Sequence, residues 1–84
     1  MTIEYKPAGV CSRLIKIDID DNDVITGVTF DGGCAGNTQG VAALARGRKV
    51  DEVIAALRGI DCRGRGTSCP DQLAAALATA LANR

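Results

Sequence analysis

Residues 59–71 constrain this chain more than any other stretch. They read GIDCRGRGTSCPD and contain two of the four cysteines, Cys62 and Cys69, together with three of the ten glycines. A flexible Gly- and Arg-rich segment adds little to an apolar core, but it lets two sulfurs approach each other. The segment therefore predicts a loop that brings two thiols together.

A helix is predicted to begin where this loop ends. Pro70 suits the first helical position because its missing N–H costs nothing there, and Ser68 and Asp71 are spaced like a capping box with a shorter acid. Residues 72–81 are rich in Ala and Leu, which are strong helix formers. The positive end of the helix dipole would favour a thiolate at Cys69. Alternatively, Cys69 is a small apolar residue that fills the helix cap.

The size and charge of the chain limit its function. Its 84 residues predict one domain, 1–84, with a thin stability margin unless a metal, disulfide or partner supports it. Zero net charge and 2% aromatic residues argue against nucleic-acid binding. No apolar run approaches the ~20 residues of a membrane span, and the N-terminus lacks an apolar signal core. We therefore predict a cytoplasmic protein, in which cysteines are more often thiols or metal ligands than disulfides.

The first half of the chain alternates between apolar and polar residues, which predicts strands. Residues 2–6 form a short strand, residues 13–20 a longer one and residues 24–30 its return strand. The alternation buries Ile15, Ile17 and Ile19 on the longer strand. On the return strand it places these residues on one face: Val24, Thr26, Val28 and Phe30.

Four acids between Asp18 and Asp23 allow two interpretations. They could bind calcium, but the spacing lacks the glycine and the distal glutamate of an EF-hand loop. A solvated hairpin turn fits the residue types better.

Helical spacing dominates the second half. A first helix is predicted after Cys34, capped by Asn37 or Thr38 and ended by Gly47, and a second over residues 50–58. Together with the final helix, this predicts an α+β fold: a three-stranded antiparallel sheet over residues 2–31, followed by three helices packed on one face. Seven helical residues are predicted to face the sheet: Val41, Leu44, Val53, Ile54, Leu57, Leu73 and Leu77.

Each cysteine falls where one element gives way to the next. Cys11 precedes a strand, Cys34 lies between a strand and a helix, Cys62 lies in a loop and Cys69 lies at a helix N-terminus. A core cysteine would more often lie within an apolar stripe. The chain has no histidine, so a site must use thiolates, alone or with Asp. Soft thiolates select zinc, iron–sulfur clusters or copper(I).

The missing histidine also removes Cys–His nucleophilic catalysis, and we predict no catalytic residue. The cysteine spacings match no CxxC knuckle, so three roles stay open: a shared metal site, a redox or disulfide pair, and purely structural thiols.

Strand direction predicts where the cysteines meet. Cys11 precedes a strand and Cys34 follows its antiparallel neighbour, so both belong to the same end of the sheet. The Gly-rich loop can deliver Cys62 and Cys69 to that end. Sulfurs sharing a tetrahedral zinc would lie about 3.5–4 Å apart, since Zn–S bonds are near ~2.3 Å.

The pentapeptide at residues 67–71, Thr-Ser-Cys-Pro-Asp, resembles the motif that gives the TSCPD domain family its name. The resemblance extends through residues 9–12, 32–37 and 57–62 and includes all four cysteines. It points to the small stand-alone, four-cysteine branch of that family, whose domain is also found at the C-terminal end of cobalamin-dependent ribonucleotide reductases.

This resemblance implies an accessory metal-binding module, not an enzyme acting alone, because 84 residues cannot supply the large barrel of a reductase. It implies a ribonucleotide reductase or another protein as partner. Two alternatives remain: a dithiol, Cys62 with Cys69, that passes electrons in ribonucleotide reduction, and an adaptor that binds a protein without metal.

The order of elements also resembles the U-type iron–sulfur cluster scaffolds. That resemblance implies a similar fold and, position by position, Cys11, Cys34 and Cys69 as ligands. This chain departs from the pattern in three ways: Ser12-Arg13 replaces Gly-Asp, the ligand-side histidine is missing and Cys62 is extra. A fourth thiolate would close the site, which favours storage or structure over transfer.

Overall fold

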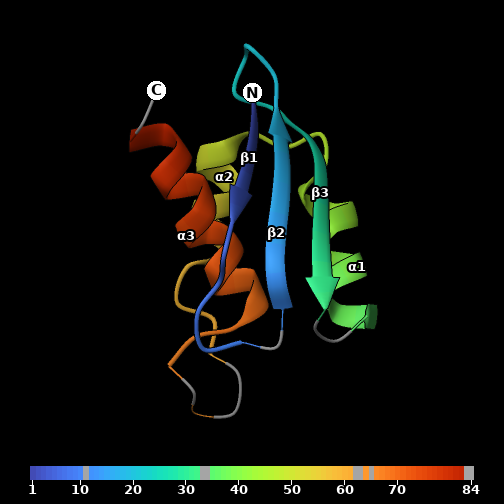
Figure 1. Cartoon of the computed structure of the whole chain (residues 1–84). Helices are drawn as coiled ribbons and strands as arrows, with labels where there is room; N and C mark the ends of the chain where they lie inside the picture. The colour runs from blue at the N-terminus through green and yellow to red at the C-terminus, as the bar shows by residue number, and fades with distance from the viewer. Residues whose placement is uncertain (11, 33–34, 62–63, 65, 83–84) are drawn as a thin grey trace.

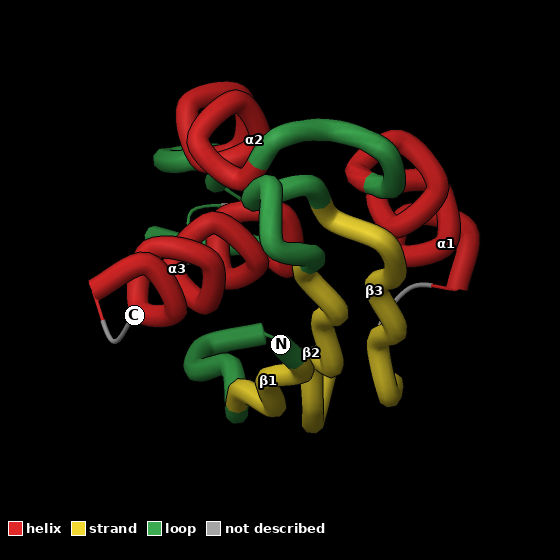
Figure 2. Tube along the Cα trace, turned by 90° about the horizontal axis from the view of Figure 1, so that it is seen from above, coloured by secondary structure: helices red, strands yellow, loops and turns green. Residues whose placement is uncertain are grey.

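The computed structural model of the chain describes residues 1–10, 12–32, 35–61, 64 and 66–82, with residues 35–37 described by their backbone alone. Three strands pair antiparallel in the order β1-β2-β3, and three helices follow (Figure 1). All the helices lie on one side of the sheet (Figure 2), which confirms the predicted α+β fold. The elements are β1 Thr2–Tyr5, β2 Ser12–Ile19, β3 Ile25–Gly32, α1 Ala35–Ala45, α2 Val50–Leu57 and α3 Cys69–Ala82.

The central strand β2 supplies the sheet side of the core. Ile15, Ile17 and Ile19 are all buried, as the alternation predicted. Ile17 lies opposite Ile3 on β1 and Val28 on β3, which places an aliphatic row across the middle of the sheet. β-branched side chains pack well on such a pleated surface.

A β-bulge in β3 overturns part of the predicted alternation. Asp18 pairs with Gly27 but Ile19 pairs with Ile25, so Thr26 is an extra residue on β3. The extra residue shifts the side-chain alternation by one position. Ile25 is therefore fully buried and Thr26 exposed, and the prediction that Thr26 shares a face with Val28 was wrong.

A second irregularity lies at the other end of β2. Ser12 pairs with Gly32 and Leu14 pairs with Asp31, which leaves Arg13 as an extra residue on β2. Simple alternation backward from Ile15 would bury Arg13 and expose Ser12. The structure has the reverse: Ser12 is buried and Arg13 is exposed. The bulge thus turns the Ser12 hydroxyl toward the helices.

The acidic hairpin between β2 and β3 is a turn, as its residue types predicted. The Asp20 carboxylate accepts hydrogen bonds from the backbone N–H groups of Asn22 and Val24, at 2.8 and 3.0 Å. This Asx-type arrangement satisfies the turn locally.

Main-chain hydrogen bonds join the hairpin end of the sheet to the loop between α1 and α2. The backbone N–H groups of Ile25, Gly47 and Val50 donate to the carbonyls of Arg48, Ile25 and Asp23, at 2.9, 2.7 and 2.9 Å. α1 ends at Ala45, and Gly47 follows two residues later at φ 86°, in the left-handed conformation typical of a glycine that terminates a helix, as predicted.

Helix α1 differs from prediction in two respects. α1 begins at Ala35, so Asn37 and Thr38 occupy positions within the helix and not the predicted position before it. Leu44, predicted to face the sheet, is 70% exposed. The other predicted helical core residues are buried or half-buried: Val41, Val53, Ile54, Leu57, Leu73 and Leu77. Across the described ranges, no helix is long and apolar enough to cross a membrane.

Candidate thiol site at the start of helix α3

Cys69 is the first residue of α3, and its side chain is a half-buried free thiol. Its sulfur lies 3.0 Å from the hydroxyl oxygen of Ser12, and either group can donate the hydrogen bond between them. This contact joins the start of the last helix to the start of the central strand. The inward turn of Ser12 at the β2 bulge makes it possible.

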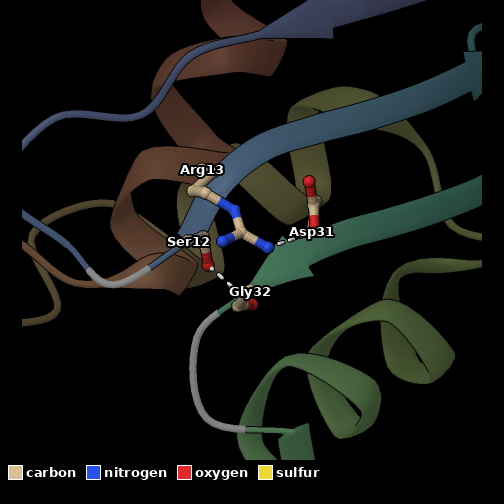
Figure 3. Close-up of polar contacts among 4 residues, drawn as sticks. All are labelled: Ser12, Arg13, Asp31 and Gly32. Atoms are coloured by element: carbon tan, nitrogen blue, oxygen red, sulfur yellow. Dashed lines mark hydrogen bonds and ion pairs between the residues drawn. The ribbon is translucent and has the colours of Figure 1, made fainter.

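The same hydroxyl also reaches the end of β3. Ser12 Oγ donates to the Gly32 carbonyl at 3.4 Å (Figure 3). On the outer surface, the guanidinium of Arg13 pairs with the Asp31 carboxylate at 3.1 Å, across the same two strands. Ser12 therefore connects both strand ends to the thiol.

A hydroxyl has a single proton, so Ser12 can donate only one of its two hydrogen bonds at a time. When Ser12 donates to the Gly32 carbonyl, the Cys69 thiol donates to Ser12. A sulfur without a proton, whether thiolate or metal-bound, cannot donate, so a hydrogen bond between these two groups then requires the Ser12 hydroxyl to donate. The Ser12 proton can therefore go to the Gly32 carbonyl or to the Cys69 sulfur, but not to both at once.

Ser68 caps α3, as the sequence predicted. Its buried hydroxyl accepts the N–H of Asp71 at 3.1 Å and donates to the carbonyl of Ile60 at 2.6 Å. The helix begins one residue earlier than predicted, so Pro70 is its second residue. One side chain therefore both starts the helix and holds the loop beside it.

The Asp71 carboxylate ties the loop to the helix. It accepts hydrogen bonds from the Thr67 hydroxyl at 2.6 Å and from the Gly59 N–H at 2.7 Å. The pKa of Asp71 lies below its ordinary value. The Thr67 hydroxyl lowers this pKa most, followed by the Gly59 N–H; burial opposes them, and the positive charge of Arg58 has the smallest effect, which also lowers it. Each of these groups favours the charged form of the acid.

The connection between β1 and β2 closes over the same helix start. The N–H of Ala8 donates to the side-chain carbonyl of Gln72 at 3.0 Å, and the Gln72 amide donates to the Thr67 hydroxyl at 2.9 Å. Gly9 adopts φ 73°, and a Cβ placed there would lie 3.0 Å from the Thr67 methyl. Residues 8 and 9, near the N-terminus of the chain, therefore pack against the family motif at residues 67–71 and the residue that follows it.

Asp61 organises the loop itself. Its two carboxylate oxygens accept the N–H groups of Gly64 and Gly66, at 2.7 and 2.5 Å. Both glycines have positive φ, a conformation that glycine adopts without steric cost.

Three of the four predicted ligands, Cys11, Cys34 and Cys62, lie outside the described residues. The predictions of their sulfur–sulfur distances and of a common end therefore remain predictions. Among the residues that the structure does describe, which include only Cys69 of the four, no group of three or more potential ligands is present.

The comparison with protein families agrees with the motif at the start of α3. The TSCPD domain model matches residues 2–81, which is almost the whole chain. The chain belongs to the TSCPD domain family. No curated protein and no solved structure matches this TSCPD domain in the corresponding comparisons.

Within this TSCPD domain, sequence reasoning found Cys69, Ser68 and Asp71 but missed Ser12 and Gly9. Ser12 is adjacent to Cys11, yet alternation alone points it outward, and only the bulge reverses that. Gly9 lies in residues 9–12, which carry part of the family resemblance, but its contact with Thr67 is between segments distant in sequence.

Proposed function

We propose that this TSCPD domain is a metal-binding module in which Cys11, Cys34, Cys62 and Cys69 together hold a zinc ion or an iron–sulfur cluster. The observation that carries the proposal is the 3.0 Å contact between the Cys69 sulfur and the Ser12 hydroxyl. The same hydroxyl donates a hydrogen bond to the Gly32 carbonyl. It joins three elements, β2, β3 and α3, at one point.

Covalent geometry supports this reach. Consecutive Cα atoms are about 3.8 Å apart, so a residue cannot be far from its sequence neighbours. Cys11 directly precedes Ser12, and Cys34 is two positions after Gly32. Cys62 is two positions after Ile60, whose carbonyl is 2.6 Å from the Ser68 hydroxyl. A site beside Cys69 is therefore within chain reach of all three other cysteines.

The donor chemistry fits such a group. The chain has four cysteines and no histidine, so a complete site would consist of thiolates, which zinc and iron–sulfur clusters prefer. When bound, the metal would supply structural cross-links between the sheet and the loop. A closed tetrathiolate site has no open position for substrate, which favours a structural or storage role over catalysis.

Ser12 would act as an outer partner of the site. Its hydroxyl is positioned to donate to the Cys69 sulfur, in exchange for its bond to Gly32. Hydrogen bonds of this kind orient metal ligands, and their loss typically lowers metal affinity about 10- to 100-fold.

Metal titration of the reduced 84-residue chain tests the proposal. Cobalt(II) is the probe, because tetrahedral cobalt–thiolate sites give intense visible bands. We expect one equivalent to saturate those bands. Each single Cys→Ser variant should lose tight binding, whereas Ser12→Ala, which keeps all four thiols, should bind about 10- to 100-fold more weakly.

The variants also separate the competing site architectures. If Cys62→Ser binds as tightly as the parent while the other three variants do not, the site uses three ligands. If no variant alters binding, the proposed site does not exist. Thr79→Ala, which removes an exposed hydroxyl farther along α3, is the matched control for Ser12→Ala and should bind like the parent.

A dithiol role in ribonucleotide reduction is the competing function suggested by the family. It requires Cys62 and Cys69 to form a reversible disulfide, with two electrons and two protons leaving to an oxidised protein partner. Mass spectrometry of the oxidised and reduced chain distinguishes the two functions. A metal-free chain whose 62–69 disulfide forms as the oxidised partner takes up its two electrons, and which an added dithiol such as dithiothreitol re-reduces, would support the dithiol role and contradict the metal site.

A further inference from the structure

A hollow of about 310 Å³ lies between α1 and α2, and its lining, within residues 41–57, takes no part in the contacts of the thiol site. It exists because the two helices pack on different neighbours: α1 mainly on β3 and α2 mainly on α3. Figure 2 shows the two helices standing apart over the sheet, joined by the loop that follows α1. Most of its lining is apolar, from Val41, Ala45, Val53 and Leu57 among others.

An apolar knob lies on the rim of this hollow. Leu44 lines it, yet the side chain is 70% exposed, more than the other large exposed apolar residues that the structure describes, Met1 at 53% and Ile60 at 41%. An exposed leucine beside an apolar hollow presents a protrusion and a receptor for it on one face.

Two opposite charges complete the lining. Arg48 and Glu52 both border the hollow and are exposed, and neither forms an ion pair with any residue of the described ranges. The Nε–H of Arg48 donates to the Leu44 carbonyl at 3.2 Å, which holds the guanidinium beside the knob. A purely acidic or purely basic partner would match only one of these two charges.

A second copy of the chain matches both. We propose that this α1–α2 face is a two-fold symmetric dimer interface, in which Leu44 of each copy enters the hollow of the other. In such an isologous contact residue i meets j and j meets i, so Arg48 can face the partner's Glu52 while Glu52 faces the partner's Arg48. Both the knob and the charges are then self-complementary.

The proposal does not depend on the metal site. One hollow and one knob per copy make a small interface, and small interfaces usually form weak, reversible complexes. We therefore expect dimerisation that depends on concentration, between roughly 1 µM and about 1 mM.

Sedimentation velocity of the full chain across that range, under reductant to prevent disulfide cross-links, is the direct test. The parent should shift from monomer to a species of twice the mass. Leu44→Asp and Arg48→Glu should each raise the dimer dissociation constant at least about 10-fold. Arg46→Glu is the matched control, because Arg46 is exposed on the same stretch but does not line this hollow. It should dimerise like the parent.

Charge exchange makes the test specific to the proposed pairing. Glu52→Arg alone should weaken the dimer, as Arg48→Glu does, because each homodimer then opposes like charges. An equimolar mixture of Arg48→Glu and Glu52→Arg should restore association, because both contacts in the mixed dimer again join opposite charges. Circular dichroism verifies that each variant is folded.

Two results would overturn the proposal. One is a parent chain that stays monomeric over the whole concentration range. The other is a dimer that Leu44→Asp leaves intact, or that the charge-exchanged mixture fails to restore, since the interface would then lie elsewhere or use other pairs.

Discussion

The two ends of the sheet are built in different ways. At the hairpin end, main-chain hydrogen bonds join β3 to the loop after α1, through Ile25 and Gly47. At the thiol end, side chains make the joints: Ser12 with Cys69, Ser68 with Ile60, and Gln72 with Ala8. Main-chain bonds tolerate many residue types, whereas side-chain joints require particular ones.

The difference teaches where to look for function. A hairpin end held by the backbone needs little from its side chains beyond turn chemistry. The thiol end requires a hydroxyl, an amide, a carboxylate and glycines at set places, and it contains the Thr67–Asp71 motif of the family. Such specific demands at a loop-rich end of a scaffold are typical of a site.

The largest effect on stability should come from a residue in the middle of the central strand, between the two ends. Ile17→Ala removes a fully buried side chain from the centre of the sheet and should lower the free energy of unfolding by about 2–5 kcal/mol. Urea denaturation followed by circular dichroism gives the value. Hydrogen exchange should show the two ends losing protection together, because small domains unfold cooperatively. Loss at one end alone would mean that the ends are independent units.

Two glycines compare the ends directly. Gly9 and Gly47 both have positive φ, but an added Cβ meets the Thr67 methyl at 3.0 Å only in the case of Gly9. Gly47→Ala should lower the free energy of unfolding by about 1–2 kcal/mol, because alanine is strained in the left-handed backbone conformation. Gly9→Ala should cost roughly 1 kcal/mol more, for the crowded contact. An equal loss of stability in the two variants, measured by thermal denaturation, would show that the Thr67 methyl moves aside at no energetic cost.

The α3 cap should have the next largest effect. Ser68→Ala removes a buried hydroxyl that bonds both Asp71 and Ile60, and we expect a loss of about 1–2 kcal/mol. Thr79→Ala on the same helix deletes an exposed hydroxyl and should change stability by less than about 0.5 kcal/mol. Chemical denaturation measures both. If Ser68→Ala loses no more stability than Thr79→Ala, the Ser68 hydroxyl does not stabilise the thiol end.

The smallest effect concerns Asp71 and pH. Its pKa is lowered in the folded chain, chiefly by the Thr67 hydroxyl, so the charged form stabilises the fold above the unfolded pKa, roughly 4. That contribution is lost as the pH falls through the lower, folded pKa. Solvent screens the carboxylate, so the change is small. Asp71→Asn should flatten this acid limb of the stability profile and Thr67→Val should reduce it; an unchanged limb in both variants contradicts the assignment.

The sheet was largely predictable because alternation reports burial directly. Ile15, Ile17 and Ile19 follow a period of two, and the structure buries all three. Alternation fails at Thr26 and Arg13, since a bulge is a one-residue shift in pairing that depends on both strands together.

The thiol end was predictable only in part. Local capping chemistry identified Ser68 and the start of α3, because its partners are close in the chain. The Ser12–Cys69 contact joins residues 57 positions apart, and no local pattern predicts such a pair. Leu44 followed the helical period of a core residue, yet α1 turns it outward beside a hollow that the sequence did not reveal.

Metal content tests the proposed role of the thiol end most directly. The full chain, purified without oxygen, should contain about one equivalent of zinc, or an iron–sulfur cluster visible in its absorbance spectrum, and Cys69→Ser should lose it. Gly47→Ala, at the opposite end, should keep it. A folded parent chain with less than about a tenth of an equivalent of any transition metal, which also fails to bind added zinc under reductant, would contradict the metal-binding role.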